Sequence, residues 1–133
     1  SLSEDEFFAS SGVRSSVEAA RNALSDKIQY LTEFLGGEYE IQGAYPAWEY
    51  RKESPLRDKM VEVYETMYGQ KPEVVAIHAG LECGLFYKKI DGLDCVSLGP
   101  DMKDIHTSEE VLDIASTERV WKYLVKVLEE LKD

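Results

Sequence analysis

Three neighbouring stretches decide the fold: IHAGLECGLF at residues 77–86, DCVSLGP at residues 94–100 and DIHTSEE at residues 104–110. In each of the first two, a short apolar run ends at a glycine, which is typical of a buried strand that runs into a turn. Glu82 follows the first run in the opening turn of a predicted helix, and His106 follows the second run in a polar loop. Because parallel strands of an open α/β sheet build sites at their carboxyl ends, the pattern predicts a carboxylate and an imidazole at one sheet edge.

Around this region, residues 54–133 alternate between helical and strand patterns. Ser54-Pro55 is a specific helix start, since serine caps the first turn and proline fits the first helical position, and Gly69 ends the helix. The elements predicted after it are a strand at Val74–Ala79, a helix at Leu81–Ile90, a strand at Cys95–Leu98 and a last helix capped by Ser116. The first of these strands has no alternation, which favours burial on both faces. The order indicates part of an α/β sandwich.

The first third of the chain has its own strand–helix–strand pattern. A strand is predicted at Glu6–Val13, then a helix with Ser16 as N-cap that stops at Gly36-Gly37, then a half-buried strand at Glu38–Ala44. Residues 46–53 form an aromatic, turn-rich connector. Each half has only two predicted strands, whereas ordinary sheets have about five, so both halves are expected to be incomplete.

Composition narrows the functional class. The 133 residues, with 44% hydrophobic and 11% aromatic side chains, are enough for one domain with a core. The net charge of -11 disfavours nucleic acids and anionic membranes as partners. No apolar run approaches the roughly 18 residues that span a bilayer, and the acidic start, SLSEDEFF, differs from a signal peptide. A cytoplasmic protein is therefore expected, in which Cys83 and Cys95 are buried thiols rather than a disulfide or a metal pair.

The two histidines have more than one interpretation. His106, flanked by Asp104, Glu109 and Glu110, is either a solvated or capping loop residue or a metal ligand. As a ligand it needs two or three more protein groups, and the sequence has no HxxxH, CxxC or HExxH spacing. For His78, beside a strand end, packing or hydrogen bonding is favoured.

Four further residues bear on a possible site. Glu82 is either a carboxylate that the dipole of its own helix stabilises or a site carboxylate at the strand edge. Gly80 and Gly84 permit close backbone approach, although GLECG lacks the spacing of a phosphate-binding loop. Arg14 is either a surface cation or a forked donor for a substrate carboxylate.

Several strings together resemble one enzyme family. They are VRSS (13–16), GAYPAWEY (43–50), SPLRDKMVEVYETMYGQKPEV (54–74), IHAGLECGLF (77–86), VSLGP (96–100) and HTSEE (106–110). The order is similar to the C-terminal part of bacterial aminoacyl-histidine dipeptidases, also called Xaa-His dipeptidases, of the aminoacylase/carboxypeptidase clan of di-zinc peptidases. The resemblance covers the chain from about Phe7 to Leu131.

The resemblance implies a fold and a site. Residues 1–46 would be a β-α-β piece of an α+β lid (dimerisation) domain, and residues 47–133 an incomplete α/β sandwich from the catalytic domain. His106 matches the last zinc ligand of the family, although Thr-Ser-Glu-Glu replaces the Ser-Pro-Asp-Glu that usually follows it. Glu82 matches a carboxylate at the substrate edge of the site. Arg14 falls near an arginine that anchors the substrate carboxylate, in a string that differs locally.

The resemblance also implies what this chain lacks. The remaining zinc ligands and the general-base glutamate belong to an N-terminal half, so no catalytic residue is expected here. The chain is then a fragment of a zinc-dependent enzyme for small dipeptides, with two zinc ions per site (cobalt or manganese being possible), and by itself it is expected to be inactive and to bind no metal tightly. Unpaired strand edges predict a homo-oligomer. The alternative is a standalone, non-catalytic binding or oligomerisation module from a truncated gene.

Overall fold

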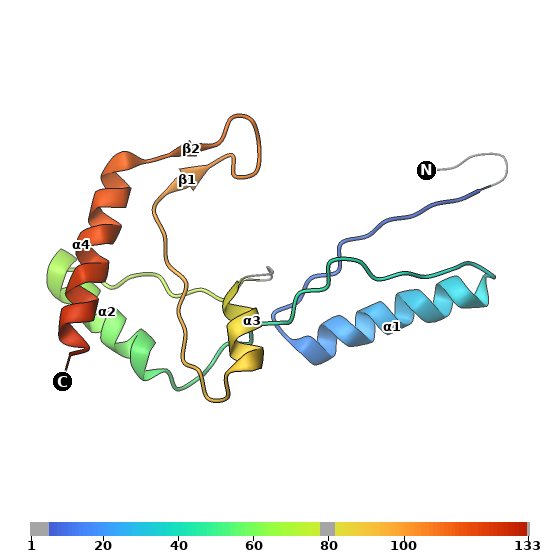
Figure 1. Ribbon diagram of the computed structural model, residues 1–133, viewed down its shortest axis with the longest axis horizontal. Helices are drawn as coiled ribbons and strands as arrows, with labels where there is room; N and C mark the ends of the chain where they lie inside the picture. Colours follow the sequence, from blue (N-terminus) through green and yellow to red (C-terminus); the bar gives the residue numbers. More distant parts are fainter. Residues whose placement is uncertain (1–5, 78–81, 133) are drawn as a thin grey trace. The chain divides into compact units, whose positions relative to one another are not determined.

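The computed structural model describes residues 6–77 and 82–132. Its elements, in order, are α1 (Glu18–Phe34), α2 (Pro55–Tyr68), α3 (Glu82–Lys89), β1 (Met102–Lys103), β2 (Val111–Leu112) and α4 (Ile114–Glu130) (Figure 1). The chain divides into two compact units. The first comprises residues 1–50 and 76–90 and holds α1 and α3, and the second comprises residues 51–75 and 91–133 and holds the other four elements. The domain boundary between residues 46 and 47 stays a prediction.

The core of the second unit lies between α2 and α4. Met60 and Val63 on α2 are buried against Tyr123 and Val127 on α4. The Tyr123 hydroxyl donates a hydrogen bond of 2.7 Å to the carbonyl oxygen of Met60, which satisfies the polar end of this buried side chain. Burial raises the pKa of the Tyr123 phenol, and the nearby ring of Tyr64 adds to the shift.

The predicted boundaries of α2 are confirmed. The Ser54 hydroxyl accepts a hydrogen bond of 3.1 Å from the backbone N–H of Arg57, Pro55 occupies the first turn, and Gly69 ends the helix with a left-handed φ of 70°. Asp94 strengthens this cap from forty residues away in the sequence. Its carboxylate accepts hydrogen bonds from the Ser54 hydroxyl (2.7 Å) and from the backbone N–H of Leu56 (3.0 Å).

The other two predicted N-caps are wrong. The last helix begins at Ile114, because the Asp113 carboxylate lies upstream of Ser116 and accepts the Ser116 N–H at 2.5 Å. The Ser116 hydroxyl instead accepts the backbone N–H of Asp101. In α1 the N-cap is Val17 rather than Ser16, and its side chain makes no cap hydrogen bond. The helix can start there because the carboxylate of Glu49, distant in sequence, accepts the first helical N–H.

Within residues 6–77 and 82–132, none of the four predicted strands forms a hydrogen-bonded ladder. Apart from an isolated bridge at Phe7, the segments 6–13, 38–44, 74–77 and 95–98 carry neither helix nor strand. The last two residues of the third predicted strand, His78 and Ala79, lie outside the described part of the chain. Alternating or apolar side chains indicate which faces a strand would bury, but a strand also requires a neighbour to hydrogen-bond with.

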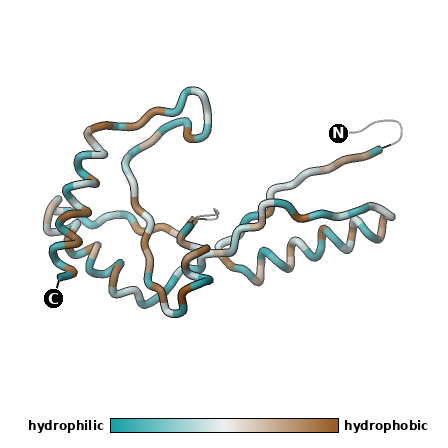
Figure 2. Tube along the Cα trace, viewed as in Figure 1, coloured by the Kyte–Doolittle hydropathy of each residue, from teal (hydrophilic) through white to brown (hydrophobic). Residues whose placement is uncertain are grey.

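One antiparallel pair forms where a loop was expected. Met102 pairs with Leu112 and Lys103 with Val111, which makes residues 101–113 a short hairpin. Four helices with this small sheet are compatible with the predicted α/β class. Both helix-rich units keep large apolar side chains exposed, notably Phe34 (86%) on α1 and Ile114 (84%) on α4, and Figure 2 shows hydrophobic residues recurring along both helices.

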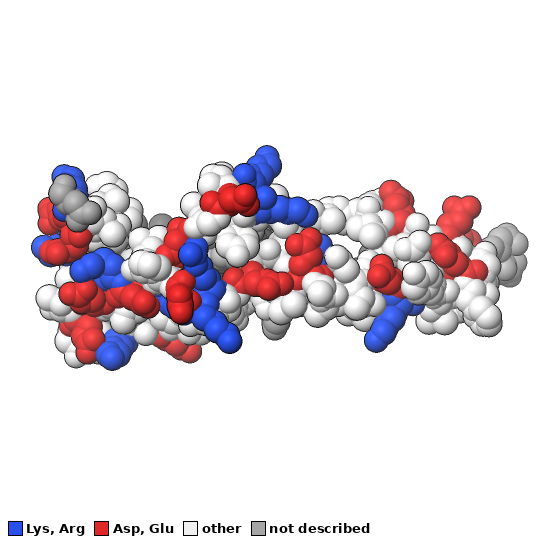
Figure 3. Space-filling view, turned by 90° about the horizontal axis from the view of Figure 1, so that it is seen from below, with Lys and Arg blue, Asp and Glu red and all other residues white. Residues whose placement is uncertain are grey.

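The charged surface of the second unit is locally balanced. On α4, Lys122 pairs with Glu118 at 2.6 Å and Lys126 pairs with Glu130 at 2.8 Å. Basic side chains lie next to acidic ones on the left of Figure 3, whereas acidic side chains predominate on its right. Among the described residues, no helix is both long and apolar enough to cross a membrane.

Candidate functional site

His106 lies at the tip of the β1–β2 hairpin. Its backbone has a left-handed φ of 68°, a conformation that is uncommon outside glycine and that histidine tolerates better than most residues. Its backbone N–H donates a hydrogen bond of 2.7 Å to Oε2 of Glu110. The turn is closed by Thr107, whose N–H and hydroxyl both donate to the carbonyl oxygen of Asp104, at 3.1 and 2.7 Å. These contacts fix the backbone of the tip and leave the His106 side chain exposed.

The tip carries one imidazole, that of His106, with the carboxylates of Glu109 and Glu110 nearby in the same turn. One oxygen of Glu110 is already engaged by the His106 backbone, and Glu109 is held by a hydrogen bond of 3.2 Å from its N–H to the Thr107 hydroxyl. Within the described ranges, no three His, Cys, Asp or Glu side chains are grouped so that they could hold a metal ion. Because a hydrolytic zinc uses about three protein ligands, these residues do not by themselves make up a zinc site.

Glu82 is the first residue of α3, and its side chain is exposed. A carboxylate in this place is stabilised by the positive end of the helix dipole, and Lys88 and Lys89 match the dipole at the other end. Gly84, one turn into the same helix, is buried against residues 46–48. The backbone of α3 therefore packs directly on that segment. Gly80, which precedes α3, lies outside the described residues.

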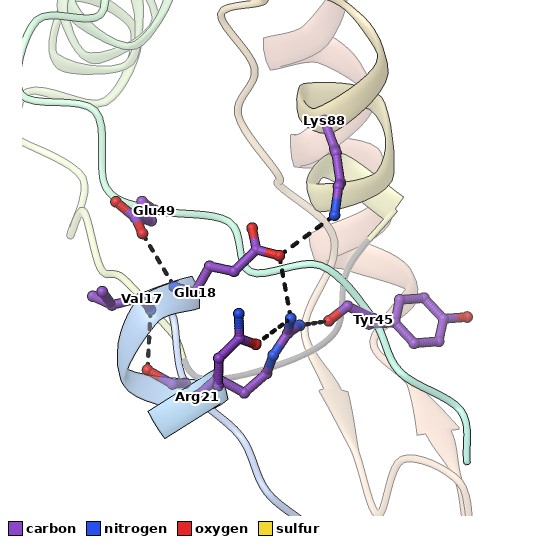
Figure 4. Close-up of polar contacts among 8 residues, drawn as sticks. Val17, Glu18, Arg21, Tyr45, Glu49 and Lys88 are labelled. Carbon is purple, nitrogen blue, oxygen red and sulfur yellow. Dashed lines mark hydrogen bonds and ion pairs between the residues drawn. The ribbon is translucent and has the colours of Figure 1, made fainter. Parts of the chain in front are cut away.

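A polar junction joins the beginning of α1 to α3 and to the segment that follows Ala44 (Figure 4). The Glu18 carboxylate pairs with Lys88 of α3 at 3.4 Å and with Arg21 of its own helix at 3.3 Å. Arg21 also donates to the carbonyl oxygen of Tyr45, and Glu49 accepts the N–H of Glu18. The sequence analysis did not single out this junction. The spacing of Glu18 and Arg21 could have suggested the local pair, but nothing in the sequence ties Glu49 or Lys88 to it.

Arg14 is exposed in the stretch that leads into α1. It belongs to the same unit as Glu82, whereas His106 belongs to the other. The structure therefore describes the three predicted site residues in two separate units, and their roles in a shared site stay predictions. Neither Cys83 nor Cys95 forms a disulfide, but both are half-buried rather than buried as predicted.

The chain is homologous to bacterial dipeptidases. It is 33% identical over 119 residues to the cytosol non-specific dipeptidase of Escherichia coli (strain K12), a match that covers 90% of this chain and 24% of the relative. In structure it is similar to the aminoacylhistidine dipeptidase of Vibrio alginolyticus, with a TM-score of 0.72, 34% identity and coverage of 90% of this chain and 24% of that one. No family model matches the chain. The chain thus spans about a quarter of the length of these relatives.

Proposed function

We propose that this chain is the C-terminal part of a zinc-dependent dipeptidase that hydrolyses Xaa-His-type dipeptides, and that it is inactive by itself. The observation that carries the proposal is the alignment of nine tenths of the chain with two dipeptidases at about one third identity. A peptidase that uses metal-activated water needs a ligand set and a general base, and the described residues supply one imidazole at the tip of a hairpin.

Within the complete enzyme, each predicted residue has a separate task. His106 contributes its exposed imidazole as a zinc ligand, with a backbone held by Glu110. Glu82 lines the substrate pocket from the first turn of α3. Arg14 holds the substrate carboxylate, since a guanidinium offers two parallel donors to such a group. Residues 1–46 serve as the end of a lid domain and residues 47–133 as the end of the catalytic domain.

The proposal extends to metal, partners and location. Two zinc ions, or cobalt or manganese in their place, occupy the site, and their remaining ligands come from the part of the enzyme that this chain does not align with. Homology to a cytosol dipeptidase supports a cytoplasmic enzyme. The large apolar side chains left exposed, such as Phe7 (75%) and Leu35 (73%), support self-association.

The decisive experiment is a pair of substitutions in the complete reading frame. His106→Ala should remove most of the hydrolysis of an Xaa-His dipeptide such as alanyl-histidine and lower the bound zinc measured by atomic absorption. Ser108→Ala, two residues along the same turn, removes a long hydrogen bond of 3.4 Å to Glu109 at an exposed position and should leave zinc content and activity largely intact. Full activity and full zinc content in the His106→Ala enzyme would refute the ligand assignment.

The isolated chain gives the second test. With added zinc or cobalt it should hydrolyse dipeptides no faster than buffer does. Robust turnover that remains after contaminating peptidases are removed would show that the chain carries a site of its own. A reading frame that encodes only these residues would favour the standalone binding module instead.

A further inference from the structure

Gly84 marks the closest backbone contact of α3. A Cβ atom built at this position would lie 2.9 Å from the carbonyl oxygen of Pro46 and 3.5 Å from Cβ of Trp48. Real Cβ atoms essentially never come within 3.0 Å of another atom, and the obstacle here is backbone rather than the end of a flexible side chain. Any residue larger than glycine would therefore have to push α3 away from residues 46–48.

The helix itself gives no reason for a glycine at this position. Glycine weakens a helix interior relative to alanine, and α3 has only eight residues. The φ of Gly84 also lies outside the left-handed region that calls for glycine, unlike the φ of Gly92 (74°). The steric role is what remains: the missing side chain lets two backbones approach each other.

A second described contact of α3 in this unit, an ion pair, is weaker. The Lys88–Glu18 ion pair spans 3.4 Å, but the two side chains are 64% and 39% exposed, and exposed pairs contribute little. Arg21 holds the carbonyl oxygen of Tyr45, which keeps residues 45–48 in place next to α1 (Figure 4). The approach at Gly84 is therefore a close backbone contact between α3 and a segment that Arg21 holds in place.

We propose that Gly84 is a positioning residue that fixes α3 on residues 46–48 and thereby places the Glu82 carboxylate two residues earlier on the same helix. The functional half of the proposal rests on the substrate role proposed for Glu82. Glu82 and Gly84 are separated by about 3 Å along the helix axis, so a displacement at Gly84 is passed to Glu82. A misplacement of about 1 Å at a reacting site can lower a rate by about 100-fold.

The packing half is tested in this chain with Gly84→Ala, in a Trp121→Phe background so that Trp48 is the fluorescent reporter. The contact predicts a shifted Trp48 emission and a lower melting temperature. Without the contact, alanine would instead stabilise the helix and raise the melting temperature, so the sign discriminates. Gly12→Ala is the matched control, because a Cβ at Gly12 meets nothing within 4 Å, and it should leave both signals unchanged.

An amide NMR spectrum of the Gly84→Ala variant gives a further check. Loss of the signals of α3, with those of α2 and α4 preserved, would also support the contact. Unchanged Trp48 emission together with an unchanged or raised melting temperature would overturn the proposal.

The functional half is tested by a double-mutant cycle in the complete dipeptidase, with kcat/KM for alanyl-histidine as the readout. Gly84→Ala should lower kcat/KM by about tenfold or more when Glu82 is present, and by less than about twofold in the Glu82→Gln background. An equal loss in both backgrounds would mean that Gly84 acts on stability alone, which overturns the positioning role. If Glu82→Gln by itself leaves kcat/KM unchanged, the substrate role of Glu82 fails, whereas the Trp48 measurement still decides the packing.

Discussion

Asp94→Asn should destabilise the second unit, because Asp94 caps α2 from outside the helix. Its carboxylate accepts a hydrogen bond from the Ser54 hydroxyl at 2.7 Å and another from the backbone N–H of Leu56 at 3.0 Å. An asparagine has the same shape, but its one carbonyl oxygen can accept only one of the two bonds. It also removes the negative charge that the positive end of the helix dipole favours.

The size of the effect follows from these contacts. A hydrogen bond to a charged group contributes about 1.5–3 kcal/mol, and a charge at a helix terminus about 0.3–1 kcal/mol. Asp94 is half-buried, so solvent screens part of these two contributions. The free energy of unfolding is therefore expected to fall by about 1–2 kcal/mol at neutral pH. Urea denaturation, followed by Trp121 fluorescence in a Trp48→Phe background, measures it. Glu73→Gln, an exposed change of the same charge in the same unit, should stay within about 0.5 kcal/mol.

The pH dependence sharpens the test. Burial by itself would raise the pKa of Asp94. The hydrogen bonds from Ser54 and Leu56 and the nearby Arg51 and Arg57 outweigh it, so that the folded pKa lies below the ordinary 3.8. The stabilisation is therefore fully present above the unfolded pKa and is lost as pH falls through the folded pKa. The stabilities of the parent and the Asp94→Asn variant should converge in that acidic range. Two parallel stability profiles, or equal stability at neutral pH, would refute the cap.

Three further outcomes are expected. Tyr123→Phe should lower the free energy of unfolding by about 1 kcal/mol in the same denaturation assay, because it removes the buried hydrogen bond to the Met60 carbonyl. The control Tyr30→Phe, at a 68% exposed position, should leave it nearly unchanged. Calorimetry of the isolated chain with zinc should show weak binding that His106→Ala weakens further; tight stoichiometric binding that survives this substitution would contradict the single-ligand interpretation. Light scattering should show a dimer or larger assembly at roughly tens of micromolar, because large apolar side chains such as Phe34 and Leu35 are exposed, and a clean monomer would contradict this expectation.

Sequence predicted the helices well because their signals are local. Ser54-Pro55 indicates the start of α2 and Gly69 indicates its end, and each signal acts within one turn of the helix. The N-cap of α4 was missed because Asp113, three residues before Ser116, forms the cap, and the N-cap of α1 was missed because a distant group competed. The carboxylate of Glu49 takes the first N–H of α1, so that Val17 becomes the N-cap although its side chain forms no cap. Contacts across 31 residues leave no periodic trace in a sequence.

Strands were harder to predict for a related reason. Apolar runs such as Cys95–Leu98 show what a strand would bury, yet the hydrogen bonds that define it come from another segment. The pair that does form, Met102–Lys103 with Val111–Leu112, is short and local. Its signal was present, since apolar residues flank the polar turn around His106 on both sides, but two-residue strands are shorter than any pattern that periodicity detects.

The candidate site shows the same division. The sequence and the resemblance named His106, Glu82 and Arg14, and the structure adds what holds two of them: Glu110 under the hairpin tip and Gly84 under α3. Neither contact could be derived from spacing alone. The motifs in a sequence identify side chains that could do chemistry, whereas the backbone contacts that orient them become visible only in three dimensions.

The exposed face of α1 connects the homology with the predicted self-association. None of the seventeen residues of α1 is buried, and Leu31 and Phe34 remain 60% and 86% exposed. Most helical stability in proteins comes from an apolar face that is covered by packing. The polar junction of Glu18 and Arg21 holds only the first turns. The apolar face of α1 therefore requires cover from elsewhere, either from the additional length that the relatives possess or from a second copy of this chain.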